Sequence, residues 1–178
     1  MRGVSSFRET SFPPPLRLRV STSRSSEPTL TPSPTPRLGV GRTGWHGLID
    51  TSVAIALKTI DRERLPRRIV VSALTIAELA GGPHGSKHDL QRVQRENQLR
   101  YVRAKVETLD FDLSCAHAYG MVYGVTIGIG RKPRGARAVD LMIAATALAH
   151  RLPLYTLNPK DLKGLEALIN VIDVGSAR

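Results

Sequence analysis

The sequence predicts an α/β fold in which helices flank a mainly parallel central sheet. From Gly47 onward, short apolar runs alternate with longer segments whose apolar residues recur at helical spacing. This alternation is typical of strand–helix–strand units that build parallel sheets. The chain of 178 residues is long enough for one domain with a hydrophobic core and short for two.

The strands are predicted from short runs rich in β-branched and other apolar residues. They cover residues 48–49, 69–72, 106–111, 154–156 and 171–173. The run Ile69-Val70-Val71 has the composition of a buried strand, because β-branched side chains pack well on a pleated surface. The first strand is short, since Trp45, His46 and Gly47 before it have little β propensity.

Helices are predicted between these strands, over residues 53–57, 74–80, 90–105, 114–122 and 139–150. Gly81-Gly82-Pro83 ends the second of them. The segment 90–105 is strongly charged and is predicted to be a solvated helix, whereas 139–150 is apolar almost all round and is predicted to be central. Glycines, a proline and three basic residues make 128–135 a loop.

The composition changes sharply near Trp45. Residues 1–46 contain seven arginines, two acidic residues and no lysine, with many Ser, Thr and Pro. They show no apolar periodicity and cannot bury enough surface to offset the entropy of ordering, so we expect this leader to be disordered. An organelle transit peptide is also Arg- and Ser-rich, but the clear amphipathic helix is missing. A mis-assigned start codon upstream of the domain 47–178 explains the leader better.

The net charge of +11 narrows the class of partner. It favours polyanions, although charge alone does not separate nucleic acid from an acidic protein or a membrane surface. No stretch approaches the roughly 18 apolar residues of a membrane span, so we expect a soluble protein. The single cysteine, Cys115, forms no internal disulfide, lies in an apolar stretch and suits a reducing compartment such as the cytoplasm. His84 and His88 are only a weak candidate zinc pair in a Gly-rich segment.

Four acidic residues fall where a parallel sheet places its ligands. Asp50 directly follows the first strand, and Glu78 lies in the helix after the second. Asp140 begins the apolar helix, and Asp161 follows the strand that contains Tyr155. Sites in parallel sheets form beyond the carboxyl ends of the strands, where the connections diverge. We therefore expect these four carboxylates to converge.

Each acid also has a simpler explanation. Asp50 and Asp140 could be N-caps, Glu78 an exposed helix residue, and Asp161 a turn residue or the cap of a helix over 162–169. The neighbours of Asp140 and Glu78 argue against this, because they are almost all apolar. A carboxylate so embedded must be paired or bind a cation. Mg²⁺ and Mn²⁺ prefer oxygen ligands, and no Cys/His cluster competes for the role.

The segments that carry these acids resemble the four motifs of PIN domains in order and spacing. The motifs are Leu48-Ile49-Asp50-Thr51-Ser52-Val53, Ala77-Glu78-Leu79, Val139-Asp140-Leu141-Met142-Ile143-Ala144-Ala145-Thr146-Ala147 and Thr156-Leu157-Asn158-Pro159-Lys160-Asp161-Leu162. The resemblance covers about residues 47–174 and is strongest to the VapC toxins of bacterial toxin–antitoxin pairs. Two departures are Leu157, where the family more often has Arg or another residue, and the long leader before the first strand.

This resemblance implies a three-layer PIN-like fold and an endoribonuclease that prefers single strands and uses Mg²⁺ or Mn²⁺. In that role Asp50 and Asp140 are the innermost metal ligands, Asp161 completes the metal site, and Glu78 binds a metal or orients the attacking water. Supporting groups are the hydroxyls of Thr51 and Ser52 and the amide of Asn158. Four basic residues before Asp140 could hold the RNA backbone, or form a solvated loop: Arg131, Lys132, Arg134 and Arg137.

Two other functions compete with the nuclease. The first is a catalytically inactive PIN-like module that binds RNA or a protein partner, although all four acids are present. The second is a phosphohydrolase of the haloacid-dehalogenase type, which needs another Asp two residues after the first, where this chain has Ser52. Gly128-Ile129-Gly130 does not stand in a phosphate-binding loop between a strand and a helix. The toxin resemblance further implies an antitoxin that inserts a segment near the site, and a homodimer.

Overall fold

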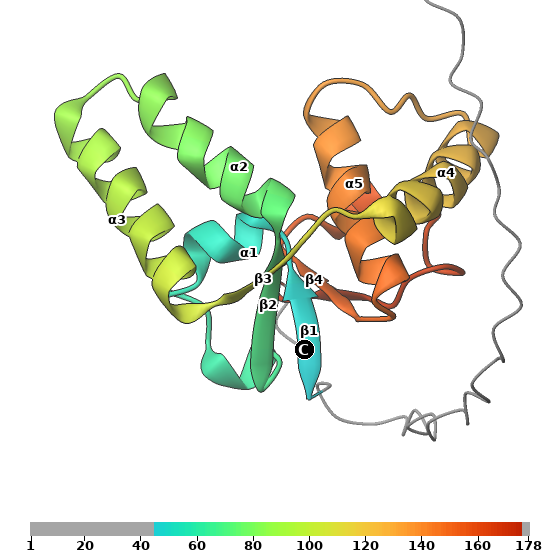
Figure 1. Cartoon of the computed structure of the whole chain (residues 1–178), viewed down its shortest axis with the longest axis horizontal. Coiled ribbons are helices and arrows are strands. Elements are labelled where there is room, and N and C mark those ends of the chain that lie inside the picture. The colour runs from blue at the N-terminus through green and yellow to red at the C-terminus, as the bar shows by residue number, and fades with distance from the viewer. Residues whose placement is uncertain (1–44, 176–178) are drawn as a thin grey trace, which may run out of the picture. The chain divides into compact units, whose positions relative to one another are not determined.

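The computed structural model describes residues 45–175 as an α/β domain (Figure 1). Its elements, in chain order, are β1 (His46–Ile49), α1 (Thr51–Ala56), η1 (Arg62–Arg64), β2 (Arg68–Ser72), α2 (Ala73–Gly81), η2 (Gly82–Gly85), α3 (Asp89–Lys105), β3 (Glu107–Leu109), α4 (Leu113–Gly128), α5 (Ala136–Ala149), β4 (Leu154–Thr156), η3 (Pro159–Leu162) and β5 (Val171–Asp173), where η denotes a 3₁₀ helix. All five predicted strands and all five predicted helices are present, so the predicted fold class is confirmed.

The sheet has five strands in the order β3-β2-β1-β4-β5, and every neighbouring pair is parallel. The chain runs outward from β1 through β2 to β3 and then crosses back to β4 and β5. The connections therefore diverge between β1 and β4, and in a parallel sheet this switch point opens a crevice at the carboxyl ends of the strands.

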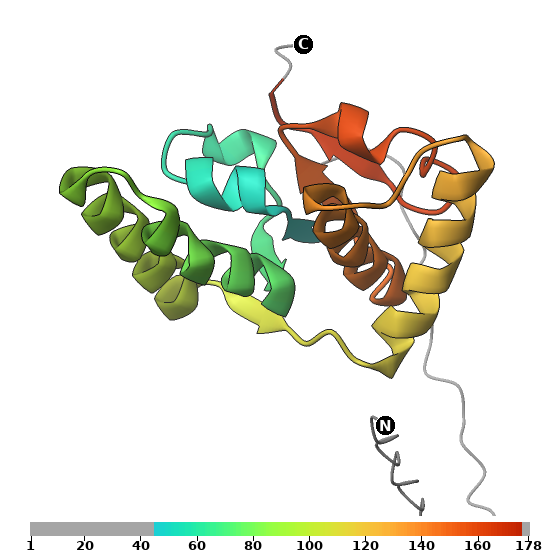
Figure 2. The same ribbon diagram turned by 90° about the horizontal axis from the view of Figure 1, so that it is seen from above.

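Helices cover both faces of the sheet, as the resemblance implied. Figures 1 and 2 show α2 and α3 on one side and α4 and α5 on the other. Successive residues of β1 divide between the two cores: Leu48 packs with Leu141 and Ile143 of α5. Ile49 packs with residues of α1, α2 and α3. This division follows from the alternation of side chains along a strand, and it confirms the three-layer arrangement.

Gly47 explains why the first strand looks weak in the sequence. A Cβ atom at this position would collide with the ring of Tyr155 on β4 and with Pro66. Tyr155 is fully buried, so its ring has no room to move aside. β1 therefore has a glycine where the neighbouring strand supplies an aromatic side chain, and pairing with β2 and β4 stabilises it as a strand.

Two helices differ from their predicted limits. α4 continues to Gly128, beyond the predicted end at residue 122, because Gly120 and Gly124 lie inside the helix rather than at its end. α5 begins at Ala136, three residues before the predicted start. The helix considered over 162–169 is absent, and the short helix η3 ends at Leu162 instead.

The predicted leader lies almost wholly outside the described residues, and its disorder stays a prediction. His46, assigned to the leader, is the first residue of β1. Cys115 is buried, as predicted, and burial raises the pKa of its thiol. Among residues 45–175, no helix is long and apolar enough to cross a membrane.

Candidate active site at the carboxyl ends of the central strands

Asp50 stands at the point where β1 passes into α1. Its Oδ1 accepts hydrogen bonds from the backbone N–H of Val53 at 2.9 Å and from the hydroxyl of Ser52 at 2.6 Å. Asp50 is therefore the N-cap of α1, as the simpler explanation held. Both of these bonds use one carboxylate oxygen, so capping is compatible with a second role for Oδ2.

Glu78 is held from the neighbouring helix. It is half-buried on α2, and its Oε2 accepts a hydrogen bond from the hydroxyl of Thr51 on α1. The same hydroxyl lies 3.4 Å from that of Thr75, one turn before Glu78. The alternative of an exposed helix residue is wrong, because Glu78 is directed toward the end of β1 rather than toward solvent.

Asp140 lies inside α5 and not at its start. The N-cap of α5 is Gly135, and no side chain caps the helix. The expectation that Asp140 begins the helix is thus wrong, and so is its N-cap alternative, since the helix already includes Ala136, Arg137 and Ala138. Asp140 is half-buried on a helix whose following residues are mostly core. A half-buried carboxylate in this position needs another explanation than capping.

The charges of the other three acids act on Asp140. Burial is the largest cause that raises this pKa, to about 6, and repulsion from Glu78, Asp161 and Asp50 raises it further. Arg137 acts in the opposite direction with a smaller effect. The carboxylates of Asp50 before α1, Glu78 on α2 and Asp161 in η3 are therefore near enough to Asp140 to repel it.

Asp161 lies in η3, the short helix after β4. The N-cap of η3 is Asn158, whose side chain makes no capping bond. Asp161 lies inside η3, so it does not cap a longer helix either. The Asp161 carboxylate is 3.9 Å from the guanidinium of Arg137, a long ion pair between partly exposed groups. Such a pair contributes little to stability, and it leaves the carboxylate available to a cation.

The four predicted basic residues have different surroundings. Arg131 donates hydrogen bonds to the backbone carbonyls of Lys160, Asp161 and Lys163. Lys132 and Arg134 are exposed between α4 and α5. Arg137, in the first turn of α5, lies beside Asp161.

One supporting contact near the site was not predicted from the sequence. The hydroxyls of Ser72, at the end of β2, and Thr146, on α5, are 3.1 Å apart and fully buried. This contact ties the carboxyl end of β2 to the helix that carries Asp140. Thr146 is a hydroxyl residue in an otherwise apolar helical run, and that is the signal by which it could have been recognised.

The carboxylates fit a hydrated divalent cation better than a closed metal site. Among residues 45–175, no group of three or more Asp, Glu, His or Cys side chains is arranged to hold a metal ion by itself, and His84 and His88 are no exception. Mg²⁺, however, keeps several of its waters and commonly takes only one or two carboxylates from the protein. The donors available here are all carboxylate oxygens, and one of them, Asp140, is desolvated and surrounded by like charge.

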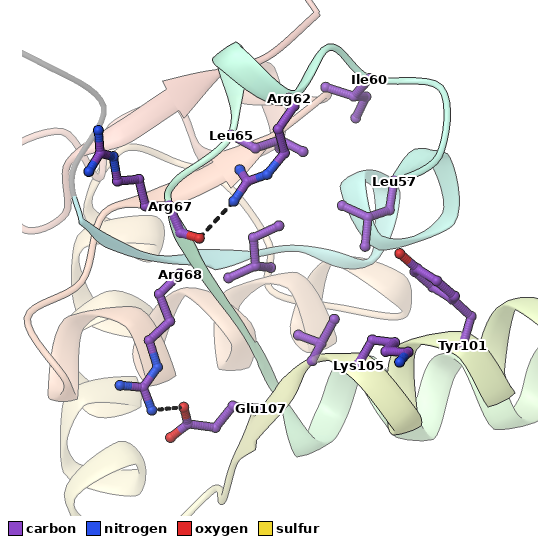
Figure 3. Close-up of a pocket in the computed structure, with 11 residues that line it drawn as sticks. Leu57, Ile60, Arg62, Leu65, Arg67, Arg68, Tyr101, Lys105 and Glu107 are labelled. Carbon is purple, nitrogen blue, oxygen red and sulfur yellow. Dashed lines mark hydrogen bonds and ion pairs between the residues drawn. The ribbon is translucent and has the colours of Figure 1, made fainter.

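A separate cavity of about 450 Å³ lies at the amino ends of β2 and β3, away from these acids (Figure 3). Its wall contains cationic side chains that are already engaged by the protein. Arg68 pairs with Glu107, and Arg62 donates to the carbonyls of Pro66 and Arg67. The guanidinium of Arg67 stacks on the ring of Trp45. These contacts indicate a structural role for the charges around this cavity.

The comparison with known families agrees with the fold and the motif spacing. The sequence model of the PIN-domain family matches residues 47–165 of this chain. The chain belongs to the PIN-domain family. The predicted resemblance is confirmed, and the phosphohydrolase alternative is wrong because it requires a different family and motif.

Relatives of this PIN domain include named ribonucleases. It is 28% identical to Ribonuclease VapC of Rickettsia bellii over 134 residues, which cover 68% of this chain and 91% of the relative. It is 29% identical to Ribonuclease VapC1 of Rickettsia felis over 140 residues, covering 72% of this chain and 96% of the relative. The match therefore spans nearly the whole length of both relatives.

A solved structure shares the fold as well. The crystal structure of VapBC-5, a member of the VapBC family of toxin–antitoxin systems from Mycobacterium tuberculosis, matches this PIN domain with 31% identity and a TM-score of 0.64. The match covers 74% of this chain and 99% of that chain. The described domain is thus similar in fold to a member of a toxin–antitoxin family.

Proposed function

We propose that this PIN domain is a metal-dependent endoribonuclease that hydrolyses RNA phosphodiester bonds and is the toxin of a toxin–antitoxin pair. The observation that carries the proposal is the meeting of Asp50, Glu78, Asp140 and Asp161 at the switch point of a parallel sheet. Relatives named Ribonuclease VapC support the choice of RNA as substrate.

The four carboxylates have distinct roles in this proposal. Asp50 and Asp140 would be the inner ligands of Mg²⁺ or Mn²⁺, and Asp161 would complete the metal site through one of the waters that the cation keeps. A bound divalent cation supplies hydroxide at neutral pH and neutralises charge on the phosphate in the transition state. Glu78, fixed by the hydroxyl of Thr51, binds the cation or orients the attacking water. Asn158 is exposed beside Pro159 and Asp161 and remains a predicted supporting amide.

The exposed basic residues between α4 and α5 suit the RNA backbone. Lys132 and Arg134 project from the loop that leads into α5, and Arg137 follows one turn before Asp140. Phosphate contacts of this kind position a nucleic acid without reading its sequence. The net charge of +11 acts in the same direction, because it speeds encounter with a polyanion.

The proposed protein partner is a cognate antitoxin, and the proposed setting is the cytoplasm. The similar VapBC-5 structure comes from the VapBC family of toxin–antitoxin systems, and a structure of VapBC-1 from nontypeable Haemophilus influenzae also matches, with 26% identity and a TM-score of 0.56. A homodimer remains part of the proposal.

RNA cleavage by the full chain tests the proposal. Wild type, Asp140→Asn and Asp89→Asn would be incubated with total RNA in Mg²⁺, in Mn²⁺ and in EDTA. Cleavage is expected only with a cation, and Asp140→Asn should lose it by orders of magnitude, because Asn keeps the volume but lacks the charge. Asp89 is exposed on α3 and, among residues 45–175, its ion-pair partner is the nearby Arg92, so its variant is the matched control.

Two outcomes would contradict the proposal. Near-wild-type cleavage by a folded Asp140→Asn protein would remove Asp140 from the active site. RNA binding by wild type without cleavage in either cation would instead support the inactive binding module.

A further inference from the structure

Arg131 joins two segments that are 30 residues apart in the chain. Its Nη1 donates to the backbone carbonyls of Asp161 at 3.1 Å and Lys163 at 3.3 Å, and its Nη2 donates to that of Lys160 at 3.0 Å. These three carbonyls belong to η3 and the residue after it. The guanidinium therefore holds the backbone of the segment that carries Asp161.

A second contact fixes the same segment from the same side. The side chain of Ile129 fills the space that a Cβ atom of Gly164 would need, and Gly164 has a φ of +94° that disfavours other residues. Ile129 and Arg131, which are close together in the sequence, thus both lie against residues 160–164. The end of α4 and the segment after β4 are packed as one unit.

The buried side chain of Leu162 anchors this segment to the core, but the backbone around it depends on weaker contacts. η3 is a four-residue 3₁₀ helix without a side-chain cap, and short 3₁₀ helices have poor hydrogen-bond geometry. The long contact with Arg137 constrains the Asp161 carboxylate only weakly. The position of that carboxylate relative to Asp140 therefore depends on the backbone that Arg131 holds.

We propose that Arg131 is a positioning residue, which sets the place of Asp161 among the carboxylates rather than contacting RNA. This inference rests on the proposed function. The planar guanidinium of arginine reaches several carbonyls at once, whereas lysine offers a single flexible point charge. Arg131 thus differs from Lys132 and Arg134, whose side chains have no hydrogen-bond or ion-pair partner in the described part of the chain.

Direct measurement of Mn²⁺ binding distinguishes a residue that positions Asp161 from one that contacts RNA. The full chain, its Arg131→Lys and Arg131→Gln variants and Arg134→Gln would be titrated with Mn²⁺ without RNA, with free Mn²⁺ read by electron paramagnetic resonance. Loss of a group that orients a metal ligand weakens metal affinity about tenfold or more. Both Arg131 variants should therefore bind Mn²⁺ about tenfold or more weakly than wild type. Their KM for RNA at saturating Mn²⁺ should stay within about twofold, while kcat falls, because a group that only orients a metal ligand makes no contact with the substrate.

Arg134→Gln is expected to behave in the opposite way. Its Mn²⁺ affinity should match wild type, and its KM should rise with a weaker dependence on salt, as for a lost phosphate contact. Gly164→Ala gives a second test of the same segment, since it strains residues 160–164 without touching Arg131. It should weaken Mn²⁺ binding as the Arg131 variants do. Circular dichroism melts identify variants that are folded.

The inference is overturned if folded Arg131 variants bind Mn²⁺ as tightly as wild type does. It is also overturned if the variants change KM for RNA rather than kcat. Wild type that binds Mn²⁺ but does not cleave RNA would contradict the proposed function alone, since the affinities of the variants still test the positioning role. Wild type that binds no Mn²⁺ would overturn both. If Arg131→Gln fails to fold, Arg131→Lys and Gly164→Ala decide the outcome.

Discussion

The hydroxyl of Ser52 accepts a hydrogen bond from the backbone N–H of Leu157 at 3.1 Å and donates one to Oδ1 of Asp50 at 2.6 Å. Leu157 directly follows β4, and Ser52 lies in the first turn of α1 after β1. The two strands beside the switch point are thus joined at their carboxyl ends by one side chain. That side chain also fixes the carboxylate proposed as an inner metal ligand.

Ser52→Ala should cost both stability and activity. It removes both bonds and leaves the half-buried N–H of Leu157 without its acceptor, which costs about 1 to 3 kcal/mol. Urea unfolding should show this loss, and RNA cleavage should fall because Asp50 is less well fixed. Ser52→Thr keeps the hydroxyl and should recover most of the stability. Equal unfolding midpoints for wild type and Ser52→Ala would contradict the expectation.

Thr51→Val should change catalysis more than stability. Valine keeps the shape of threonine but cannot donate to Oε2 of Glu78. We expect kcat for RNA to fall about tenfold, the scale of a lost orienting contact, with KM unchanged. Thr51→Ser keeps the donor and serves as the matched control. If Thr51→Val raises KM instead, Thr51 contacts RNA and does not orient Glu78.

The fold could be predicted because its signals are local. Apolar runs such as Ile69-Val70-Val71 identify strands, and the parallel sheet follows from their alternation with helices. The limits of α4 and α5 could not be predicted in the same way. Glycine disfavours a helix interior, yet Gly120 and Gly124 lie in exposed positions of α4, where packing of the opposite face against α5 maintains the helix.

The places of the four acids in the fold follow from the sequence, whereas their contacts do not. The position of Asp50 after β1 and that of Asp161 after β4 follow from the strand order, which brings these strands together. The capping explanation for Asp140 depended on where α5 starts, and this is decided by the turn at Gly135 with its φ of +61°. The contacts of Arg131 join residues about 30 positions apart, and no local pattern indicates them.

Two Gly→Ala substitutions should change stability in opposite directions. At Gly47 the added methyl group meets the buried ring of Tyr155, and overpacking of this kind costs about 1 to 3 kcal/mol or more. At Gly120, inside α4, a Cβ atom meets nothing within 4 Å, so alanine should stabilise the helix by about 0.5 to 1 kcal/mol. Urea unfolding of the two variants measures both effects. Destabilisation at both positions would show that the exposed face of α4 is covered in solution.

The stability of the metal-free protein should depend on pH through Asp140. Its pKa is raised to about 6 in the folded protein by burial and by Glu78, Asp161 and Asp50, whereas an ordinary Asp titrates near 3.9. The folded state therefore binds this proton more tightly than the unfolded state does. The resulting stabilisation is complete below about pH 4 and is lost as the pH rises through about 6. Because Asp140 is only half-buried, solvent screening limits the effect to about 1 to 2 kcal/mol.

Melts of wild type and Asp140→Asn in EDTA, between pH 4 and pH 8, measure this dependence. The substituted asparagine carries no charge, so the variant should melt above wild type at pH 7.5 and approach it near pH 4. Mn²⁺ should raise the wild-type melt at pH 7.5, because a ligand that binds only the folded state stabilises it. The rise should be smaller at pH 5, where the proton on Asp140 competes with the cation. Curves for the two proteins that stay parallel across this range would show that Asp140 does not share a charged site with the other three acids.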